Sequence, residues 1–330
     1  MDRILEVEDL NVEVTKRSAV TRIIDQAVFE IRAGEIVCLV GESGSGKSVT
    51  ARAIMGLMQS SADVEVSGRI TFDGNDISKG GDASKPFRGT DIAMVFQEPL
   101  SSLDPVFTIE SQLRETLRRR FGARSVKQER EILIELLEKV GIHDGARVLR
   151  SYPHQLSGGM CQRVMIAQAL STEPKLLIAD EPTTALDVTV QAQILELIDS
   201  LRATTGMSVL LVTHDMGVAA QMADRVVVMY AGRVVEDAPP MEIFQTAKHP
   251  YTEGLLSCIP PLTEKRQGLL PAIPGSVPDP SDRPSGCAFN PRCDRATDEC
   301  RANVPPLEKI GDSYAACFHP LGLVSETRQS

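Results

Sequence analysis

The sequence predicts an α/β fold built around a parallel sheet, and three observations lead to this prediction. Residues 41–48 form a G-x-x-x-x-G-K-[ST] loop that follows the apolar run 36–40 and precedes the helical pattern 49–58. Strand-like and helix-like segments then alternate along the chain, which is typical of parallel sheets. A stretch with only helical periodicity, from about residue 108 to 172, interrupts this alternation and indicates an inserted helical subdomain.

The individual elements follow from their local patterns. Alternating apolar and polar residues predict strands near the N-terminus, and turn residues bound a further short strand. Two amphipathic helices have clear apolar faces, and the last strands form a hairpin around Ala231-Gly232. The expected strands are 4–7, 10–14, 27–31, 68–74, 175–180, 208–213, 225–230 and 233–235, and the helical faces are Ile132, Leu133, Leu136, Leu137 and Val140, then Val190, Ile194, Leu197, Ile198 and Leu201.

Composition limits the class of protein. A chain of 330 residues has room for roughly two domains. Its net charge of −10 argues against nucleic acid as the main partner, because binding a phosphate backbone needs a basic face. No apolar run approaches the ~18–20 residues of a transmembrane helix, and the acidic start has no secretory signal. We therefore expect a cytosolic protein that reaches membranes through protein partners.

The glycine-rich loop predicts a phosphate site. Glycines let the backbone curl so that successive N–H groups face phosphate oxygens, and the following helix adds its positive N-terminus. Lys47 would reach the β- and γ-phosphates, and the Ser48 hydroxyl would ligate Mg²⁺. The alternative, a turn with a chance lysine, does not account for the flanking strand and helix. The predicted loop residues are Gly41, Glu42, Ser43, Gly44, Ser45, Gly46, Lys47 and Ser48.

Further polar residues stand at the ends of predicted elements. Asp180-Glu181 ends an apolar strand, where Asp180 could hold Mg²⁺ and Glu181 could act as a general base, although a helix often starts in this way. Ser157, Gly158, Gly159 and Met160 precede a long helix and form either a second anion site or a simple cap. Gln97 and His214 each follow a strand and, taken singly, are more typical of surface or capping residues.

Taken together and in order, these motifs resemble those of the ATPase subunits of ABC transporters, over about the first 235 residues. The resemblance rests on 41–48, Gln97, 156–160, Asp180-Glu181, Ala185-Leu186-Asp187 and His214. It implies a RecA-like P-loop core with an antiparallel β subdomain and a helical subdomain at about 98–172, all within residues 1–237. It further implies ATP and Mg²⁺ as ligands.

The family likeness also implies roles for the residues in a head-to-tail dimer. Glu181 would be the catalytic base, His214 would contact the γ-phosphate and the attacking water, and Gln97 would contact Mg²⁺ and lie where the membrane subunit docks. Mg²⁺ would be held through Ser48, Gln97 and Asp180. The signature residues Ser157, Gly158, Gly159 and Met160 would be donated to the partner's ATP, and Asp187 would lie at the dimer seam. One departure is Met160, where the family usually has Gln; another is Val14, which stands where an aromatic ring usually stacks on adenine.

The C-terminal part, 238–330, differs in composition and carries 14 of the 20 prolines. The segments His249-Pro250-Tyr251-Thr252, Ile273-Pro274-Gly275 and 284–293 resemble the C-terminal extension of dipeptide and oligopeptide importer ATPases. This likeness implies uptake of peptides or a related small solute, with a second ATPase subunit, two transmembrane permease subunits and an extracytoplasmic solute-binding protein. The chain would lie on the cytoplasmic face of the bacterial inner membrane. The alternative is a non-transport ABC ATPase that acts on ribosomes or DNA.

Four of the seven cysteines crowd into this extension: Cys287, Cys293, Cys300 and Cys317. In a reducing compartment such a cluster predicts a metal site rather than disulfides. The residues alone leave zinc and iron–sulfur open, since thiolates suit both. The likeness to peptide-importer ATPases favours a [4Fe–4S] cluster, with zinc as the alternative. A separate basic stretch, Arg114, Arg118, Arg119 and Arg120, could face a membrane subunit or lipid, or be a solvated helix face.

Overall fold

The structure is a computed structural model that describes residues 2–16, 19–58, 62–79, 81–184, 186–259 and 272–322. Ala185, in the predicted Ala185-Leu186-Asp187 motif, lies outside the described residues, as do 260–271 and 323–330 of the predicted extension. No helix in these described ranges is long and apolar enough to cross a membrane.

The strands form two sheets. They are β1 (Arg3–Lys16), β2 (Ala19–Arg32), β3 (Ile36–Val40), β4 (Val64–Phe72), β5 (Asn75–Asp76), β6 (Ile92–Val95), β7 (Leu176–Asp180), β8 (Ser208–Thr213), β9 (Arg225–Tyr230), β10 (Arg233–Ala238), β11 (Glu308–Ile310) and β12 (Ser313–Ala315). An antiparallel sheet has the order β2-β1-β4-β5, and the larger sheet has the order β11-β12-β10-β9-β3-β8-β7-β6. In the larger sheet β9, β3, β8, β7 and β6 are parallel, as the alternating pattern predicts.

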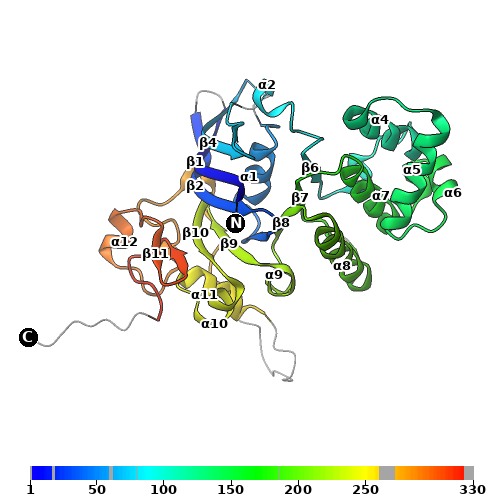
Figure 1. The fold of residues 1–330 in the computed structure, drawn as a ribbon. Coiled ribbons are helices and arrows are strands. Elements are labelled where there is room, and N and C mark those ends of the chain that lie inside the picture. The colour runs from blue at the N-terminus through cyan, green and yellow to red at the C-terminus, as the bar shows by residue number, and fades with distance from the viewer. Residues whose placement is uncertain are drawn as a thin grey trace, which may run out of the picture.

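The helices fill the connections. They are α1 (Lys47–Ile54), α2 (Gly81–Ser84), α3 (Pro99–Ser102), α4 (Ile109–Phe121), α5 (Val126–Lys139), α6 (Gly145–Arg150), α7 (Gly158–Leu170), α8 (Val188–Thr205), α9 (Met216–Met222), α10 (Pro240–Thr246), α11 (Pro250–Ser257) and α12 (Asp298–Ala302), with short 3₁₀ turns η1 (Pro153–Gln155), η2 (Pro280–Asp282) and η3 (Asn290–Arg292). Figure 1 shows α4–α7 as a lobe on one side of the molecule and α12 with β11 on the opposite side.

The larger sheet is buried on both faces, which explains the continuous apolar runs in its strands. In β3, Val37 and Leu39 pack with α1 and with the antiparallel sheet in one core cluster. Ile36, Cys38 and Val40 belong to the other cluster, which includes residues of α7, α8 and α9. Helix α1 therefore lies between the two sheets, and its N-terminus is fixed at the end of β3. The hairpin of β9 and β10 turns at Ala231 and Gly232, both of which have positive φ, as expected for a two-residue turn.

The helical lobe contains a buried ion cluster. Glu129 of α5 is buried and accepts bonds from Arg118, at 2.7 and 2.9 Å, while Arg114 lies 3.0 Å from it. Arg120 pairs with Asp91. Arg118, Arg119 and Arg120 are exposed and Arg114 is half-buried, so the basic stretch lies on a solvent-facing part of α4 in which Arg114, Arg118 and Arg120 are also ion-paired within the subunit.

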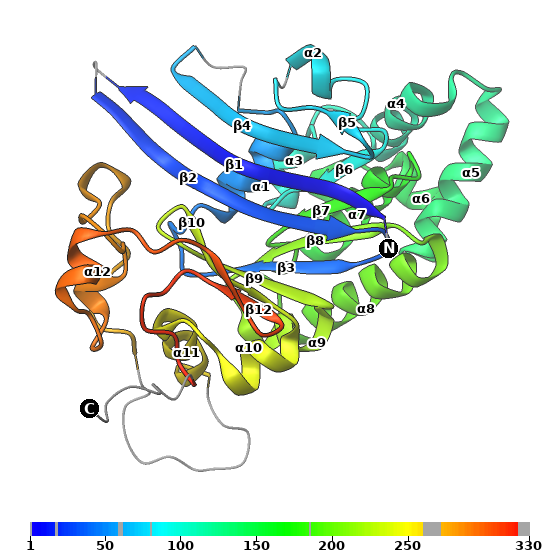
Figure 2. The same ribbon diagram turned by 60° about the vertical axis from the view of Figure 1, so that its left-hand side comes forward.

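The C-terminal segment is built onto the core sheet. Strand β12 pairs with β10 through Glu236–Ala315 and Asp237–Tyr314, and β11 pairs with β12 as the outermost strand at this side of the sheet. Figure 2 shows β12 beside β10, with α10 and α11 next to them.

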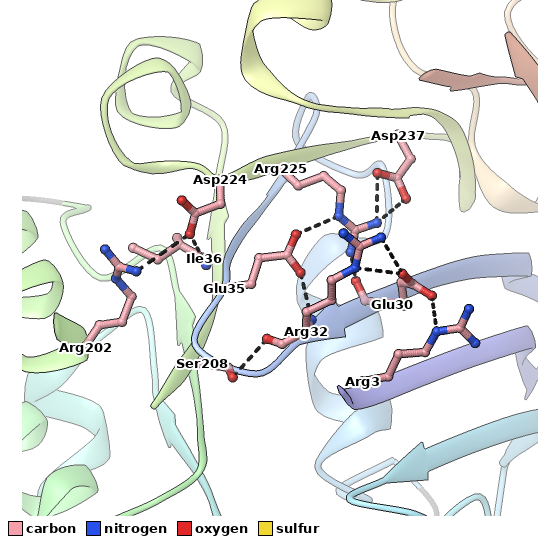
Figure 3. A network of polar contacts seen from close by, with 10 residues as sticks. All are labelled: Arg3, Glu30, Arg32, Glu35, Ile36, Arg202, Ser208, Asp224, Arg225 and Asp237. Carbon is pink, nitrogen blue, oxygen red and sulfur yellow. Dashed lines mark hydrogen bonds and ion pairs between the residues drawn. The ribbon is translucent and has the colours of Figure 1, made fainter. Parts of the chain in front are cut away.

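A polar network joins the two sheets at the start of β3, the end opposite the phosphate loop (Figure 3). Arg225 donates to Glu35 at 2.9 Å and to Asp237 at 2.8 Å, and it also bonds the Glu30 carbonyl. Burial raises the pKa of the Asp237 carboxyl to about 6, against the opposing effect of Arg225. Because β2, β3, β9 and β10 all contribute, this network fixes the antiparallel sheet relative to the core.

Candidate nucleotide-binding and hydrolysis site

The phosphate loop connects β3 to α1, and its geometry requires glycine at two positions. Gly41 has φ +148°, and a Cβ there would collide with the carbonyl oxygen of Met229. Gly46 has φ +103°, and a Cβ there would lie 2.5 Å from the Ile24 side chain. The loop backbone can therefore curl tightly against β9 and β2, which leaves its N–H groups and the N-terminus of α1 as the anion-binding elements.

Lys47 is buried at the first position of α1. Its ammonium group donates to the carbonyl oxygens of Gly41 at 2.7 Å and Glu42 at 3.0 Å. Burial lowers the pKa of Lys47, while the carboxylates of Glu181, Asp180 and Glu42 act in the opposite direction. The ammonium group thus bonds two successive carbonyls of the loop backbone, at the place where the loop motif expects phosphate oxygens.

Ser48 and Asp180 form a pair that suits a magnesium ion. The Ser48 hydroxyl donates to Oδ1 of Asp180 at 2.7 Å. The other oxygen, Oδ2, is buried and has no hydrogen-bond partner in the described part of the chain. Burial raises the pKa of Asp180, partly offset by the Ser48 bond. A hard cation prefers oxygen ligands, so an unpartnered buried carboxylate oxygen beside a hydroxyl fits Mg²⁺.

Glu181 is the centre of a hydrogen-bonded group at the end of β7. Its Oε2 accepts from the amide of Gln97 at 2.9 Å and from the hydroxyl of Thr184 at 2.8 Å. Its Oε1 lies 3.2 Å from Nδ1 of His214. The structure therefore brings together the three residues predicted for catalysis. It adds Thr184, which sequence reasoning missed and which the spacing of three residues after Glu181 could have indicated.

Lys47, Ser48 and Glu181 line one open cleft of about 710 Å³, whereas Asp180 and Thr184 are not among its lining residues. The lining residues from outside the predicted motifs include Ile23 of β2, and Leu255 and Pro280 of the C-terminal segment. Val14, the position without the expected aromatic ring, pairs within its sheet with Thr21 and Val64 and is not among the residues that line the cleft. The lining residues also include Gly41, Glu42, Ser43, Gly44, Gly46, Lys47, Ser48, Gln97, Glu181 and His214.

The signature residues lie elsewhere. Ser157 caps α7 by accepting a hydrogen bond from the backbone N–H of Met160 at 3.3 Å. Ser157 and Gly158 are exposed, Gly159 and Met160 are half-buried, and none of the four lines the cleft of this chain. Asp187 likewise caps α8, accepting from the N–H groups of Thr189 and Val190. Within one chain, therefore, the signature residues and the phosphate loop do not line the same cleft.

The four C-terminal cysteines share a small cavity of about 20 Å³, lined also by His249 and His319. Burial raises the pKa of Cys287 and Cys293, and it raises that of Cys317 to about 11. No group of three or more His, Cys, Asp or Glu side chains in the described residues is arranged to hold a metal ion. The structure thus brings the four cysteines together, while the prediction of an iron–sulfur or zinc site gains no support from their arrangement.

Comparison with known proteins agrees with the motifs. The family model described as "ABC transporter" matches residues 24–184, and the one described as "Oligopeptide/dipeptide transporter, C-terminal region" matches 235–300. The dipeptide transport ATP-binding protein DppD of Escherichia coli is 44% identical over 321 residues, covering 96% of this chain and 97% of that protein. The oligopeptide transport ATP-binding protein AppD of Bacillus subtilis is 48% identical over 309 residues, covering 93% of each.

Solved structures show the same fold. The ATP-binding cassette MJ0796, in a dimeric post-hydrolysis state bound to ADP and Pi, superposes with a TM-score of 0.64 at 28% identity, covering 72% of this chain and 98% of that one. The cbiO1 protein from Clostridium perfringens gives a TM-score of 0.63 at 29% identity, covering 74% and 92%. The predicted fold class, with its P-loop core, antiparallel sheet and helical lobe, is confirmed. The chain belongs to the ABC transporter family, among the ATP-binding proteins of dipeptide and oligopeptide transport.

Proposed function

We propose that this chain binds and hydrolyses ATP to power the uptake of peptides, or of a related small solute, through an ABC importer. The observation that carries the proposal is the placement of Glu181 beside Asp180 at the end of β7, in the same cleft as Lys47. A general base, a magnesium ligand and a phosphate-binding lysine are the groups that hydrolysis of a bound nucleotide needs. Similarity to peptide-transport ATPases over nearly the whole chain supports the solute class.

The chemistry follows from the contacts of Glu181. Its carboxylate takes a proton from a water molecule as that water attacks the γ-phosphorus; the bond to the bridging oxygen breaks, and ADP and phosphate result. Gln97, Thr184 and His214 hold the carboxylate in one orientation through the bonds at 2.9, 2.8 and 3.2 Å. Mg²⁺, bound through Ser48, Asp180 and Gln97, would neutralise charge on the phosphates.

The exposed signature supports a head-to-tail dimer. Ser157, Gly158, Gly159 and Met160 stand at the N-terminus of α7, outside the cleft that contains this chain's own phosphate loop. In the proposed dimer they contact the ATP held by a second ATPase subunit, a related but different chain, and Asp187 lies at the seam. Two transmembrane permease subunits and an extracytoplasmic solute-binding protein complete the importer, and this chain sits peripherally on the cytoplasmic face of the bacterial inner membrane.

The C-terminal cysteines are proposed to hold a [4Fe–4S] cluster, with zinc as the alternative. The side chains are of the type that binds iron–sulfur clusters or zinc, because four thiols line one cavity and no carboxylate residue is among the lining residues. Cys287, Cys293, Cys300 and Cys317 would be the ligands, and the cluster would stabilise a proline-rich segment with little core of its own.

Metal and sulfide analysis tests the cysteine site. Anaerobically purified protein should contain iron and sulfide and absorb near ~400 nm. Serine at any of the four positions should lower the iron content and destabilise the extension more than it weakens ATP binding. Stoichiometric zinc without iron would mean that the site binds zinc and not an iron–sulfur cluster. Four freely titratable thiols in the metal-replete protein would overturn both the cluster and the zinc assignment.

Reconstitution tests the function. The chain, co-expressed with its permease subunits and the second ATPase, should co-purify with the membrane complex and hydrolyse ATP faster when the solute-binding protein delivers a peptide. Lys47→Ala is the matched inactive variant. Co-purification with ribosomes or DNA instead of permease subunits would overturn the importer assignment in favour of a non-transport ATPase.

A further inference from the structure

Glu42, the second residue of the phosphate loop, is held by the C-terminal extension. Arg292 forms a two-pronged ion pair with its carboxylate, with N–O distances of 2.8 and 3.1 Å. The backbone N–H of Glu42 donates to the Tyr251 hydroxyl at 2.8 Å, and its carbonyl accepts from Lys47 at 3.0 Å. Side chain, N–H and carbonyl of one loop residue are therefore all fixed, two of them by groups more than 200 residues away.

Arg292 is itself rigidly held. Its side chain is only 5% exposed, and it also donates to the carbonyl of Pro274 at 2.8 Å and the hydroxyl of Tyr230 at 3.3 Å. Its guanidinium lies over the rings of Tyr230 and Phe289, at 5.7 and 5.9 Å from their centroids. Bidentate and stacked contacts of this kind suit arginine and not lysine. The guanidinium is thus a fixed positive group beside the phosphate loop.

The charge on Glu42 poses a problem for a loop that binds a polyanion. Glu42 lines the nucleotide cleft and its carboxylate acts electrostatically on Lys47. A carboxylate left without Arg292 would compete with phosphate oxygens for the Lys47 ammonium and would repel the phosphate chain. Pairing with a nearly buried arginine neutralises it and holds it away from the lysine.

We propose that Arg292 is a positioning residue for nucleotide binding: by holding and neutralising the Glu42 carboxylate, it keeps Lys47 and the phosphate loop available for the phosphates of ATP. The inference rests on the proposed function, since it assumes that the cleft binds ATP. Arg292 stands directly before Cys293 and in the turn that follows Cys287, so the segment that carries the cysteines also carries this group.

The experiment measures dissociation constants of the full chain for Mg²⁺ complexes of the non-hydrolysable β,γ-imido analogue of ATP and of ADP. Arg292→Met should weaken binding of the ATP analogue about tenfold, and binding of ADP less, because the repulsion grows with phosphate charge. Arg292→Lys should lie between, since it keeps the charge but loses the two-pronged pair. Arg301→Met, which removes an exposed ion pair with Asp298 in the same extension, is the matched control and should change neither constant.

The double variant separates positioning from mere packing. Adding Glu42→Gln to Arg292→Met should return the dissociation constant to within about threefold of wild type, because the unneutralised carboxylate is gone. Glu42→Gln alone, which leaves Arg292 and its aromatic contacts in place, should weaken binding much less than Arg292→Met does.

The outcomes distinguish the two proposals. Unchanged affinity in Arg292→Met, or weakening by Glu42→Gln alone as large as that by Arg292→Met, overturns the positioning role while leaving the nucleotide site intact. A wild-type chain that fails to bind the ATP analogue, or binds it no better than Lys47→Ala, overturns the proposed function and this inference together. Should Arg292→Met fail to fold, Arg292→Lys and Glu42→Gln still decide the question.

Discussion

Glu181 lies in a left-handed backbone conformation with φ +46°, which is unusual for a residue with a side chain. Such a conformation costs on the order of 1–3 kcal/mol and persists where neighbours over-determine it. Here the N–H of Glu181 donates to Val212 at 2.9 Å, and its carboxylate has the three side-chain contacts described above. The residue therefore reaches the cleft in a fixed direction as soon as the sheet is formed.

Replacing this carboxylate tests its role as the base. Glu181→Gln keeps the shape but cannot accept the proton, so ATP turnover in the assembled complex should fall by ~10² or more while ATP binding persists. Steady-state hydrolysis and equilibrium binding measure the two effects. Near-normal turnover, with this chain's site as the only competent one, would disprove the assignment.

We expect Thr184 to affect ATP turnover only through its hydrogen bond to the Glu181 carboxylate. Thr184→Val removes one hydrogen bond to the carboxylate with little change in volume, and we expect turnover to fall about tenfold with unchanged ATP affinity. Thr184→Ser, which keeps the hydroxyl, is the control and should retain most of the activity. An equal loss of turnover in both variants would show that the hydrogen bond from the Thr184 hydroxyl does not contribute to the function of Glu181.

Helix α7 is the element expected to contact a second ATPase subunit, because its N-terminus carries the exposed signature residues. Ser157→Arg should spare ATP binding by the isolated chain, since Ser157 does not line the cleft, and should block ATP-driven pairing with the second ATPase subunit. Size-exclusion chromatography with ATP in a Glu181→Gln background measures the pairing. Loss of ATP binding by the monomer would contradict the shared site.

Helices α4 and α5 provide a pH-dependent prediction. The hydrogen bond from Arg118 and that from the Arg124 N–H lower the pKa of Glu129 to about 2, from an ordinary 4.5. A carboxyl whose pKa is lowered in the folded state stabilises it above the ordinary pKa, and this stabilisation is lost as pH falls toward the folded-state value. Urea unfolding should therefore show wild type losing stability between about pH 4.5 and 2 more steeply than Glu129→Gln. The exposed Glu138→Gln on the same helix should follow wild type.

The elements also show what sequence patterns can and cannot reveal. The phosphate loop, the apolar strands and the hairpin at Ala231-Gly232 were predictable because each is specified by neighbouring residues. The pair of Glu42 and Arg292 was not, because 250 residues separate the partners and neither stands in a local pattern. The ion pairs of the basic stretch on α4 were not predictable for the same reason, since the partners Glu129 and Asp91 lie outside that helix.

At the scale of the whole molecule, the extension belongs to the ATPase sheet. Ala316 donates its backbone N–H to Val235 at 2.9 Å, next to the pairing of β12 with β10. Ala316→Pro removes this donor and leaves a sheet carbonyl without a partner, which should lower the free energy of unfolding by about 1–3 kcal/mol and promote association through the exposed edge. Urea unfolding and light scattering measure these effects, and Ala316→Gly, which keeps the N–H, is the control. Equal stability of the two variants would show that the pairing contributes little.

The late position of β12 in the chain has a consequence for synthesis. Strand β10 ends at Ala238, but its neighbour β12 begins only at Ser313, so on the ribosome the β10 edge of the core sheet is open until β12 has been made. At roughly 5–20 residues per second the intervening segment takes several seconds to appear, far longer than strands need to pair. During that interval two nascent chains on one messenger can pair through their open edges. Pairing of β12, the last strand in the described part of the chain, therefore ends the interval in which the β10 edge can pair with another nascent chain.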